Sequence, residues 1–299
     1  MTQTGDGPGH VWVDGRLMPA AGPHLSAFDR GFQLGDGVFE TLRARGGRPT
    51  ELAEHTARLR RSADGLGIEL PDDLAARLAD AIAELLAAED LAGAEGDASI
   101  RITVSRGRIT QRGLLAQVPH VAPTIVVQAS PVVPAAADLL ARGLHVVGSS
   151  VRRDVESPLA GLKTTSRADY VYARLEADRA GADDALFLTT DGYLSEGTSA
   201  NLFLVRGGEL ATPSLACAVL AGTTRDWLLR WAATAGLTSR ETLLTSRDLL
   251  EAEEAFLSSS VAGVLPVTRF DGHVIGPGLP GPWTTRARTD REAFIRGAG

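Results

Sequence analysis

Apolar positions recur along the chain at two different spacings, which predict a mixture of helices and strands. Between residues 72 and 91 an apolar residue returns every three or four positions, at Leu74, Leu78, Ile82 and Leu85. This is the spacing of an amphipathic helix, and we expect the helix to serve packing alone. The other predicted helices cover residues 52–66, 166–180, 224–235 and 247–251.

Short apolar runs that end at turn residues predict the strands. Residues 10–13 lead into Asp14 and Gly15, a pair that is typical of a hairpin turn. Residues 37–43 alternate between apolar and polar positions, and two glycines mark the turn that follows. Further strands are predicted at residues 99–104, 124–128, 143–151, 185–189, 201–205 and 255–257.

The composition changes after Pro131, where Pro134 and three alanines follow. Such a segment is typical of a linker, so we predict one at residues 133–137, between a domain of residues 1–132 and a domain of residues 138–299. Helices and strands mix in the first domain, whereas strands dominate the second. The expected fold class is therefore α+β, with a smaller N-terminal α/β domain and a larger strand-rich C-terminal domain that also carries helices.

Composition and charge exclude several kinds of protein. The 299 residues are 44% hydrophobic and carry a formal net charge of -7. Because no run of Lys or Arg exceeds two residues, we expect no nucleic-acid partner. No uncharged apolar run reaches the ~18 residues that a membrane-spanning helix needs, and the polar N-terminus lacks the apolar segment of a secretory signal. The sequence therefore predicts a cytoplasmic protein with no membrane partner.

Metal and disulfide chemistry are disfavoured as well. Cys217 is the only cysteine, which excludes an internal disulfide and a multi-cysteine metal site. The six histidines are scattered without the spacing of zinc ligands. We expect no bound metal, and we interpret Cys217 as a small buried apolar residue.

Lys163 is the first candidate for chemistry, because it is the only lysine among 30 basic residues. A lysine amine with the usual pKa of about 10.4 is a poor nucleophile, but a desolvated amine, or one captured as an imine, is reactive. Arginine forms no imine, because its guanidinium stays protonated. Residues 162–166 superficially resemble the end of a glycine-rich phosphate-binding loop but lack its glycines, which excludes a nucleoside-triphosphatase. Lys163 is therefore either a solvated surface residue or a reactive amine.

Three further features suggest what such an amine would work with. Glu196 lies between a glycine turn and an apolar strand, where a carboxylate either caps backbone amides or keeps a pyridine nitrogen protonated. Gly222, Thr223 and Thr224 open a predicted helix, and such a turn either caps the helix or binds a phosphate. Arg58 is the candidate cation for that phosphate, or one more exposed helix arginine.

Seven stretches of the chain together resemble the fold type IV (class IV) pyridoxal-phosphate family, which includes branched-chain and D-amino-acid aminotransferases and aminodeoxychorismate lyases. The stretches follow the family's order: residues 29–40, 55–59, 105–107, 160–163, 194–203, 222–226 and 258–267. The resemblance covers almost the whole chain. It implies the two-domain class IV fold, pyridoxal 5'-phosphate as the cofactor, and a homodimer in which a loop of the partner, expected within residues 108–115, borders each site.

The resemblance also implies residue roles. Lys163 matches the lysine that bonds to the cofactor, and Glu196 matches the carboxylate beside the pyridine nitrogen. Ala168 stands where branched-chain enzymes carry a tyrosine, and Tyr170 points elsewhere on a helix, which weakens the match to that subtype. The phosphate-binding residues of the family match Arg58, Gly222, Thr223, Thr224 and Ser260.

The substrate clues point in two directions. Arg101 and Arg167 follow the lyase pattern, whereas Phe39 with Glu40, and the Gly-Thr-Thr turn, are more similar to the aminotransferases. Arginines suit a substrate with one or two carboxylates, although each is otherwise a surface residue. Phe39 lines a substrate pocket or belongs to the core. The candidate substrate-binding residues are Phe39, Arg101, Arg112 and Arg167.

Three functions remain open on this basis. The favoured one is transamination between an amino acid and a 2-oxo acid, of the branched-chain or D-amino-acid type. The alternative is a lyase that converts 4-amino-4-deoxychorismate to p-aminobenzoate and pyruvate. A cofactor-binding protein without catalysis is disfavoured, because Lys163 and Glu196 are both present.

Overall fold

The computed structural model describes residues 9–111, 113–115 and 121–297. The chain divides into two compact units, of which unit 1 ends its main part at Val133 and unit 2 begins at Pro134. Residues 132–136, most of the predicted linker, have no regular secondary structure. Two segments depart from the expected division: Leu162–Arg167 and the end of the chain from Ile295 belong to unit 1, although the sequence predicted both within the second domain.

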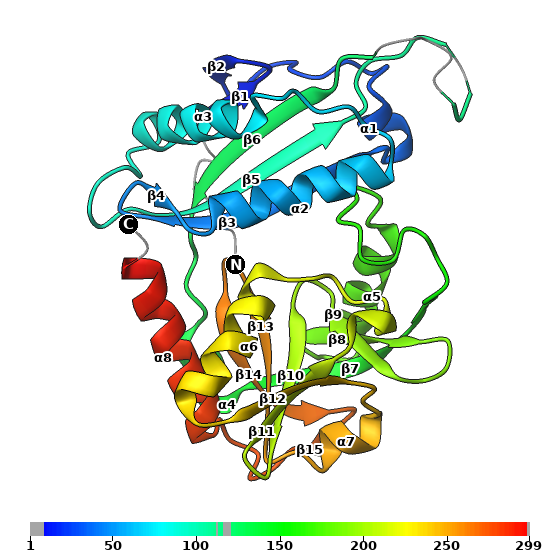
Figure 1. Cartoon of the computed structure of the whole chain (residues 1–299), viewed down its shortest axis with the longest axis vertical. Coiled ribbons are helices and arrows are strands. Elements are labelled where there is room, and N and C mark those ends of the chain that lie inside the picture. Colours follow the sequence, from blue (N-terminus) through cyan, green and yellow to red (C-terminus); the bar gives the residue numbers. More distant parts are fainter. Residues whose placement is uncertain (1–8, 112, 116–120, 298–299) are drawn as a thin grey trace. The chain divides into compact units, whose positions relative to one another are not determined.

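Unit 1 is built on a six-stranded antiparallel sheet with the strand order β2-β1-β6-β5-β3-β4. Two helices, α2 and α3, pack against its strands (Figure 1). The elements of this unit are β1 (His10–Val13), β2 (Arg16–Pro19), α1 (Arg30–Leu34), β3 (Gly37–Arg45), β4 (Arg48–Pro49), α2 (Leu52–Gly65), α3 (Leu74–Ala88), β5 (Asp97–Ser105) and β6 (Thr124–Pro131).

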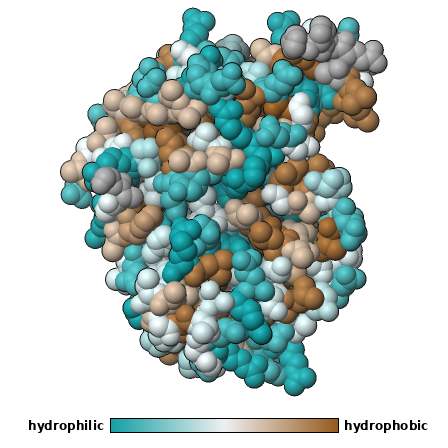
Figure 2. Space-filling model, viewed as in Figure 1, coloured by the Kyte–Doolittle hydropathy of each residue, from teal (hydrophilic) through white to brown (hydrophobic). Residues whose placement is uncertain are grey.

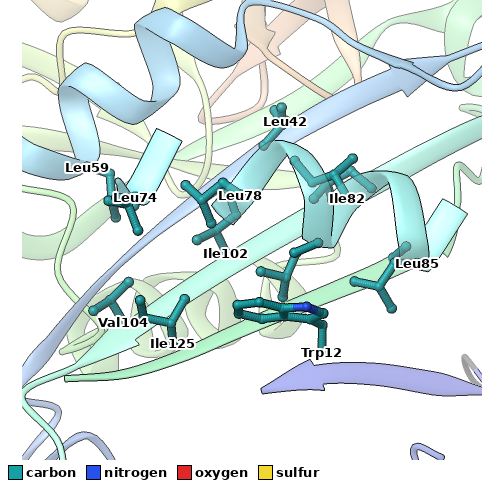
Figure 3. Close-up of a cluster of buried hydrophobic side chains, with 14 of the residues drawn as sticks. Trp12, Leu42, Leu59, Leu74, Leu78, Ile82, Leu85, Ile102, Val104 and Ile125 are labelled. Carbon is teal, nitrogen blue, oxygen red and sulfur yellow. The ribbon is translucent and has the colours of Figure 1, made fainter. Parts of the chain in front are cut away.

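The core of unit 1 lies between one face of this sheet and the two helices. Leu78 and Ile82 of α3 face Ile102 of β5, and Leu59 of α2 and Trp12 of β1 join the same cluster (Figure 3). All five side chains are at most 4% exposed. Burial of a side chain of this size stabilises the fold by about 1.5–3 kcal/mol, so the apolar spacing seen in the sequence is the main source of stability here.

Strand alternation separates two kinds of residue on β3. Val38, Glu40 and Leu42 point toward the helices, whereas Phe39 points to the opposite face of the sheet. The segment Leu162–Arg167 runs beside the start of β3: the backbone N–H of Phe39 donates to the Lys163 carbonyl at 3.0 Å, and the Thr165 N–H donates to the Gly37 carbonyl at 2.8 Å. These bonds explain why the segment belongs to unit 1.

Unit 2 carries a nine-stranded sheet of mixed direction. The strands follow the order β12-β11-β10-β13-β14-β7-β8-β9, β15 pairs with β14, and β9 also pairs with β10, so six of the strands form a closed ring. Its elements are α4 (Ala137–Arg142), β7 (Leu144–Arg153), α5 (Ala168–Arg179), β8 (Asp184–Thr189), β9 (Leu194–Gly197), β10 (Asn201–Arg206), β11 (Glu209–Pro213), η1 (Leu215–Cys217), α6 (Thr223–Ala235), β12 (Thr238–Thr242), α7 (Ser246–Leu250), β13 (Glu254–Ser259), β14 (Gly263–Phe270), β15 (His273–Val274) and α8 (Pro282–Gly297).

Two helices of unit 2 pack against its strands, and candidate site residues lie on or beside these elements. Helix α5 packs on β7 and β8, and α6 packs on β12 and β13. The pairing of β9 with β10 sets Glu196 opposite Asn201, at the closure of the ring. Within the described ranges, no helix is long and apolar enough to cross a membrane.

Candidate functional site

The backbone of Lys163 makes two hydrogen bonds within unit 1. Its N–H donates to Ser62 Oγ at 3.1 Å, and its carbonyl accepts from Phe39. The side chain is partly buried, and Nζ lies 4.5 Å from the centroid of the Phe39 ring. The only lysine of the chain is therefore placed against an aromatic ring by two hydrogen bonds, which is not the setting of a freely solvated surface amine.

Two arginines share the Phe39 ring with Lys163. The guanidinium carbon of Arg101 lies 4.1 Å from the ring centroid, and that of Arg167 lies 5.6 Å from it. Burial lowers the pKa of Arg101, and the positive charge of Arg167 lowers it further. Three cations around one ring attract an anionic group, and each contact with a ring face is itself stabilising by about 0.5–2 kcal/mol. We call Arg101, Lys163 and Arg167 the cation cluster.

Arg106, which lies in the family-like stretch of residues 105–107, makes different contacts. Arg106 forms a two-pronged ion pair with Asp36, with Nε at 2.8 Å and Nη2 at 3.0 Å from the two carboxylate oxygens. Burial raises the pKa of Asp36, but hydrogen bonds from Arg106 and Arg30 lower it below its usual range. Arg106 therefore stabilises the fold of unit 1. Arg112 lies outside the described residues.

Arg58 is buried in a second ionic group on the helix side of β3. Its Nε and Nη2 each donate to the Glu40 carboxylate at 2.7 Å, and His55 Nδ1 lies 2.7 Å from the same carboxylate. Burial raises the pKa of Glu40, but the hydrogen bonds and charge of Arg58, together with His55, lower it from 4.5 to about 2. Arg58 therefore has a carboxylate partner, which its predicted role at a phosphate did not include.

Glu196 lies in unit 2 at the closure of the strand ring and is 6% exposed. Its carboxylate accepts from the Leu220 N–H at 3.0 Å and from the Tyr170 hydroxyl at 3.3 Å. Asn201 Nδ2 lies 3.5 Å from the carboxylate, and the guanidinium of Arg153 lies 4.0 Å from it. These neighbours orient the Glu196 carboxylate within unit 2.

The Gly-Thr-Thr turn begins helix α6, as predicted. Gly222 is the N-cap, and a Cβ at this position would lie 2.1 Å from Asn201 Oδ1, so no larger residue fits without displacing that side chain. Thr223 Oγ1 and Ser260 Oγ are 3.2 Å apart. Unit 2 therefore brings Gly222, Thr223 and Ser260 together at the N-terminus of a helix of 13 residues, where the helix dipole favours an anion.

Several residues of these groups were not singled out from the sequence as site residues. Glu40 and His55 were assigned no role in the site, although a glutamate on the buried side of a strand is itself a signal of an ionic partner. Tyr170 was set aside because of its direction, yet its hydroxyl reaches Glu196. Arg153 had no local signal, because its partner lies 43 residues away in the chain. Asn201 lies in the family-like stretch of residues 194–203 but was assigned no role.

Comparisons with known proteins place the chain in a family. Residues 37–270 match the family described as amino-transferase class IV. The chain is 31% identical over 284 residues to the D-alanine aminotransferase of Bacillus licheniformis, covering 93% of this chain and 94% of that protein. It is also 31% identical over 261 residues to the aminodeoxychorismate lyase of Bacillus subtilis, covering 87% and 86%.

A solved structure extends the likeness to the whole fold. The branched-chain amino acid aminotransferase of Escherichia coli superposes with a TM-score of 0.89 at 25% identity, over 97% of this chain and 95% of that one. The chain belongs to the class IV aminotransferase family. The predicted α+β class IV fold and the predicted enzyme class, an aminotransferase, are thereby confirmed.

Proposed function

We propose that the protein is a pyridoxal-phosphate-dependent transaminase that exchanges an amino group between an amino acid and a 2-oxo acid. The observation that carries the proposal is the placement of Lys163, the single amine side chain of a class IV family member, against Phe39 and between two arginines. A lysine amine in this family can act both as the nucleophile that bonds to a carbonyl and as a base.

The residues present fit pyridoxal phosphate. Glu196 is an oriented carboxylate suited to a protonated pyridine nitrogen, and Thr223 and Ser260 offer hydroxyls beside the N-terminus of α6, which suit a phosphate. Lys163 supplies the amine that would bond to the aldehyde. Arg58 is the remaining phosphate candidate. When bound, pyridoxal phosphate withdraws electrons from the amino acid and so makes its Cα proton removable.

Lys163 is the proposed base of the reaction. Once free as an amine, its Nζ would take the proton from the substrate Cα and would donate it to C4′ of the cofactor, which is general base and then general acid catalysis by one group. Glu196 is oriented by the Leu220 N–H and the Tyr170 hydroxyl, and its carboxylate would hold a proton on the pyridine nitrogen. The cation cluster would orient the substrate by its carboxylate.

The lyase remains the second candidate, and the cation cluster is the observation that favours it. A substrate with two carboxylates gains from both Arg101 and Arg167, whereas a monocarboxylate with an apolar side chain gains from only one. The likeness to the B. subtilis protein named aminodeoxychorismate lyase supports this alternative.

We also propose a homodimer and a cytoplasmic location. Large apolar side chains are exposed around α1: Phe32 is 77% exposed, and Leu114 and Leu115 in a later loop are 81% and 82% exposed. Figure 2 shows brown, hydrophobic residues on the visible surface of the molecule. Exposed apolar groups of this size are typical of a surface that a second copy covers. A single buried cysteine, Cys217, suits a reducing compartment.

One experiment tests the proposed function. The purified protein is reduced with borohydride in the presence of pyridoxal phosphate, and its peptides are mapped; we expect the pyridoxyl group on Lys163 and none in Lys163→Ala. The enzyme is then assayed with L- and D-amino acids plus 2-oxoglutarate or pyruvate, and with aminodeoxychorismate in parallel. Amino transfer supports the transaminase, release of pyruvate from aminodeoxychorismate supports the lyase, and a wild-type protein without label contradicts both.

A further inference from the structure

Arg291 is the largest side chain of the described residues that is almost completely buried, with 1% of its surface exposed. It lies on α8, where its guanidinium carbon is 5.2 Å from the centroid of the Trp227 ring and 5.0 Å from that of Phe294. Removing a guanidinium from water is costly, so a buried arginine has to be offset by hydrogen bonds and charge around it. The family resemblance assigned this residue no role.

The surroundings of Arg291 connect it to the Gly-Thr-Thr turn. Its Nη2 donates to Thr224 Oγ1 at 3.3 Å, and Thr224 is the second residue of α6 and 2% exposed. The N-terminus of a helix is its positive end, where a cation is unfavourable and an anion is favourable. Arg291 therefore adds positive charge to a place that is already positive. A bound anion would instead be attracted both by the helix N-terminus and by the charge of Arg291.

The contacts of α8 hold the arginine in this position. Trp231 Nε1 of α6 donates to Asp290 of α8 at 2.8 Å, directly beside Arg291 in the chain. The rings of Trp227 and Phe294, 5.7 Å apart, lie on the guanidinium and restrict its rotamers. The guanidinium is thus oriented toward Thr224 before any ligand binds.

We propose that Arg291 is a positioning residue for the cofactor phosphate and acts through the Thr224 hydroxyl. A threonine hydroxyl has one proton to donate and two lone pairs. Because Arg291 donates to the oxygen, one lone pair is occupied and the hydroxyl proton is directed away from the arginine, toward the turn. A hydroxyl that accepts a charged hydrogen bond is also a stronger donor. This inference rests on the proposed function, since it assumes that the turn binds the phosphate of pyridoxal phosphate.

The test measures the contribution of the phosphate to binding separately from that of the rest of the cofactor. Full-length apoprotein is titrated with pyridoxal phosphate and with pyridoxal, which lacks the phosphate, and the dissociation constants are compared. Loss of a hydrogen bond to a charged group reduces affinity by about tenfold to a hundredfold. We expect Arg291→Met to lose this much affinity for pyridoxal phosphate while its affinity for pyridoxal stays within about twofold of the wild type.

Two further variants keep the inference testable if Arg291→Met folds poorly. Arg291→Gln retains a donor without the charge and should fall between the wild type and Arg291→Met. Thr224→Val should show the same selective loss of pyridoxal phosphate affinity. Because both side chains act on one hydroxyl, the double variant should be no weaker than the weaker single variant. The matched control is Arg286→Met on the same helix, because Arg286 donates to the Ala235 carbonyl at 3.0 Å and is 47% exposed.

The outcomes distinguish this inference from the proposed function. A wild-type protein that binds neither pyridoxal phosphate nor pyridoxal contradicts the proposed function. If the wild-type protein prefers pyridoxal phosphate and the Arg291 and Thr224 variants keep the same preference, the role of Arg291 is overturned. The proposed function then still stands. Equal loss for both ligands, or a loss in the Arg286 control of the same size, also overturns it.

Discussion

The Glu40 carboxylate allows a quantitative prediction about the stability of unit 1. Its side chain is 0% exposed, and it accepts two hydrogen bonds from Arg58, each of 2.7 Å. We consider two perturbations, a fall in pH and the substitution Glu40→Gln. The first protonates the carboxylate, and the second replaces it with a neutral group of the same shape.

The magnitude follows from the pKa of Glu40, which is lowered from 4.5 to about 2. A depressed pKa means that the folded state favours the ionised carboxylate, so the stabilisation is complete above pH 4.5 and is lost as the pH falls toward 2. The difference corresponds to about 3 kcal/mol. Glu40→Gln should cost a similar amount at neutral pH, because it leaves Arg58 as a buried charge without its carboxylate.

The assay is urea unfolding of wild type and Glu40→Gln between pH 6 and pH 3, with hydrogen exchange of the β3 and α2 amides as a local measure. We expect the gap in unfolding free energy to be largest at pH 6 and to shrink below pH 4.5. The control is Glu95→Gln, whose carboxylate is 97% exposed although it pairs with Arg45, and whose effect should not be resolved. A gap that is absent at pH 6, or that stays constant down to pH 3, would refute the reasoning.

Three further predictions concern the site and the assembly. Glu196→Gln should keep cofactor binding but reduce turnover by about two orders of magnitude, because the neutral amide no longer holds a proton on the pyridine nitrogen. An unchanged rate in steady-state assays contradicts this prediction. Arg101→Leu should reduce kcat/KM by about tenfold to a hundredfold without changing the cofactor absorption spectrum, and no effect on any substrate would make Arg101 a structural residue. Light scattering at assay concentration should give a homodimer, and a fully active monomer excludes it.

Helix α3 was predictable because all of its buried positions are apolar. The helix expected at residues 72–91 is α3, because its inward positions are leucine, isoleucine and alanine. Helix α8 was not predicted, although its buried residues Thr284, Ala287, Arg291 and Ile295 have helical spacing. Two of these four are polar, so no apolar period is visible. Strand β12, with four exposed polar residues, was missed for the same reason.

Candidate residues were predictable where their rarity or their place in a family-like stretch marked them. Lys163 stood out as the only lysine, and Glu196 through the stretch around it. Their partners were not predictable, because the contacts join distant parts of the chain. Tyr170 reaches Glu196 across 26 residues, and Arg291 reaches Thr224 across 67. A sequence period reports which face of an element is buried, but it does not report which polar group lies opposite.

The register of strand β3 affects both the stability of unit 1 and the geometry of the candidate site. Successive side chains of a strand point to opposite faces, so Glu40 meets Arg58 under α2 while Phe39 meets Lys163 and Arg101 on the other side. A shift of one residue would bury Phe39 under the helix and place a carboxylate among the cation cluster, where it would compete with an anionic substrate. The buried Glu40–Arg58 pair opposes such a shift, because an ionised carboxylate moved away from its guanidinium loses about 3 kcal/mol of stabilisation. The ionic group on one face of β3 therefore specifies the register that presents Phe39 to Lys163 on the other.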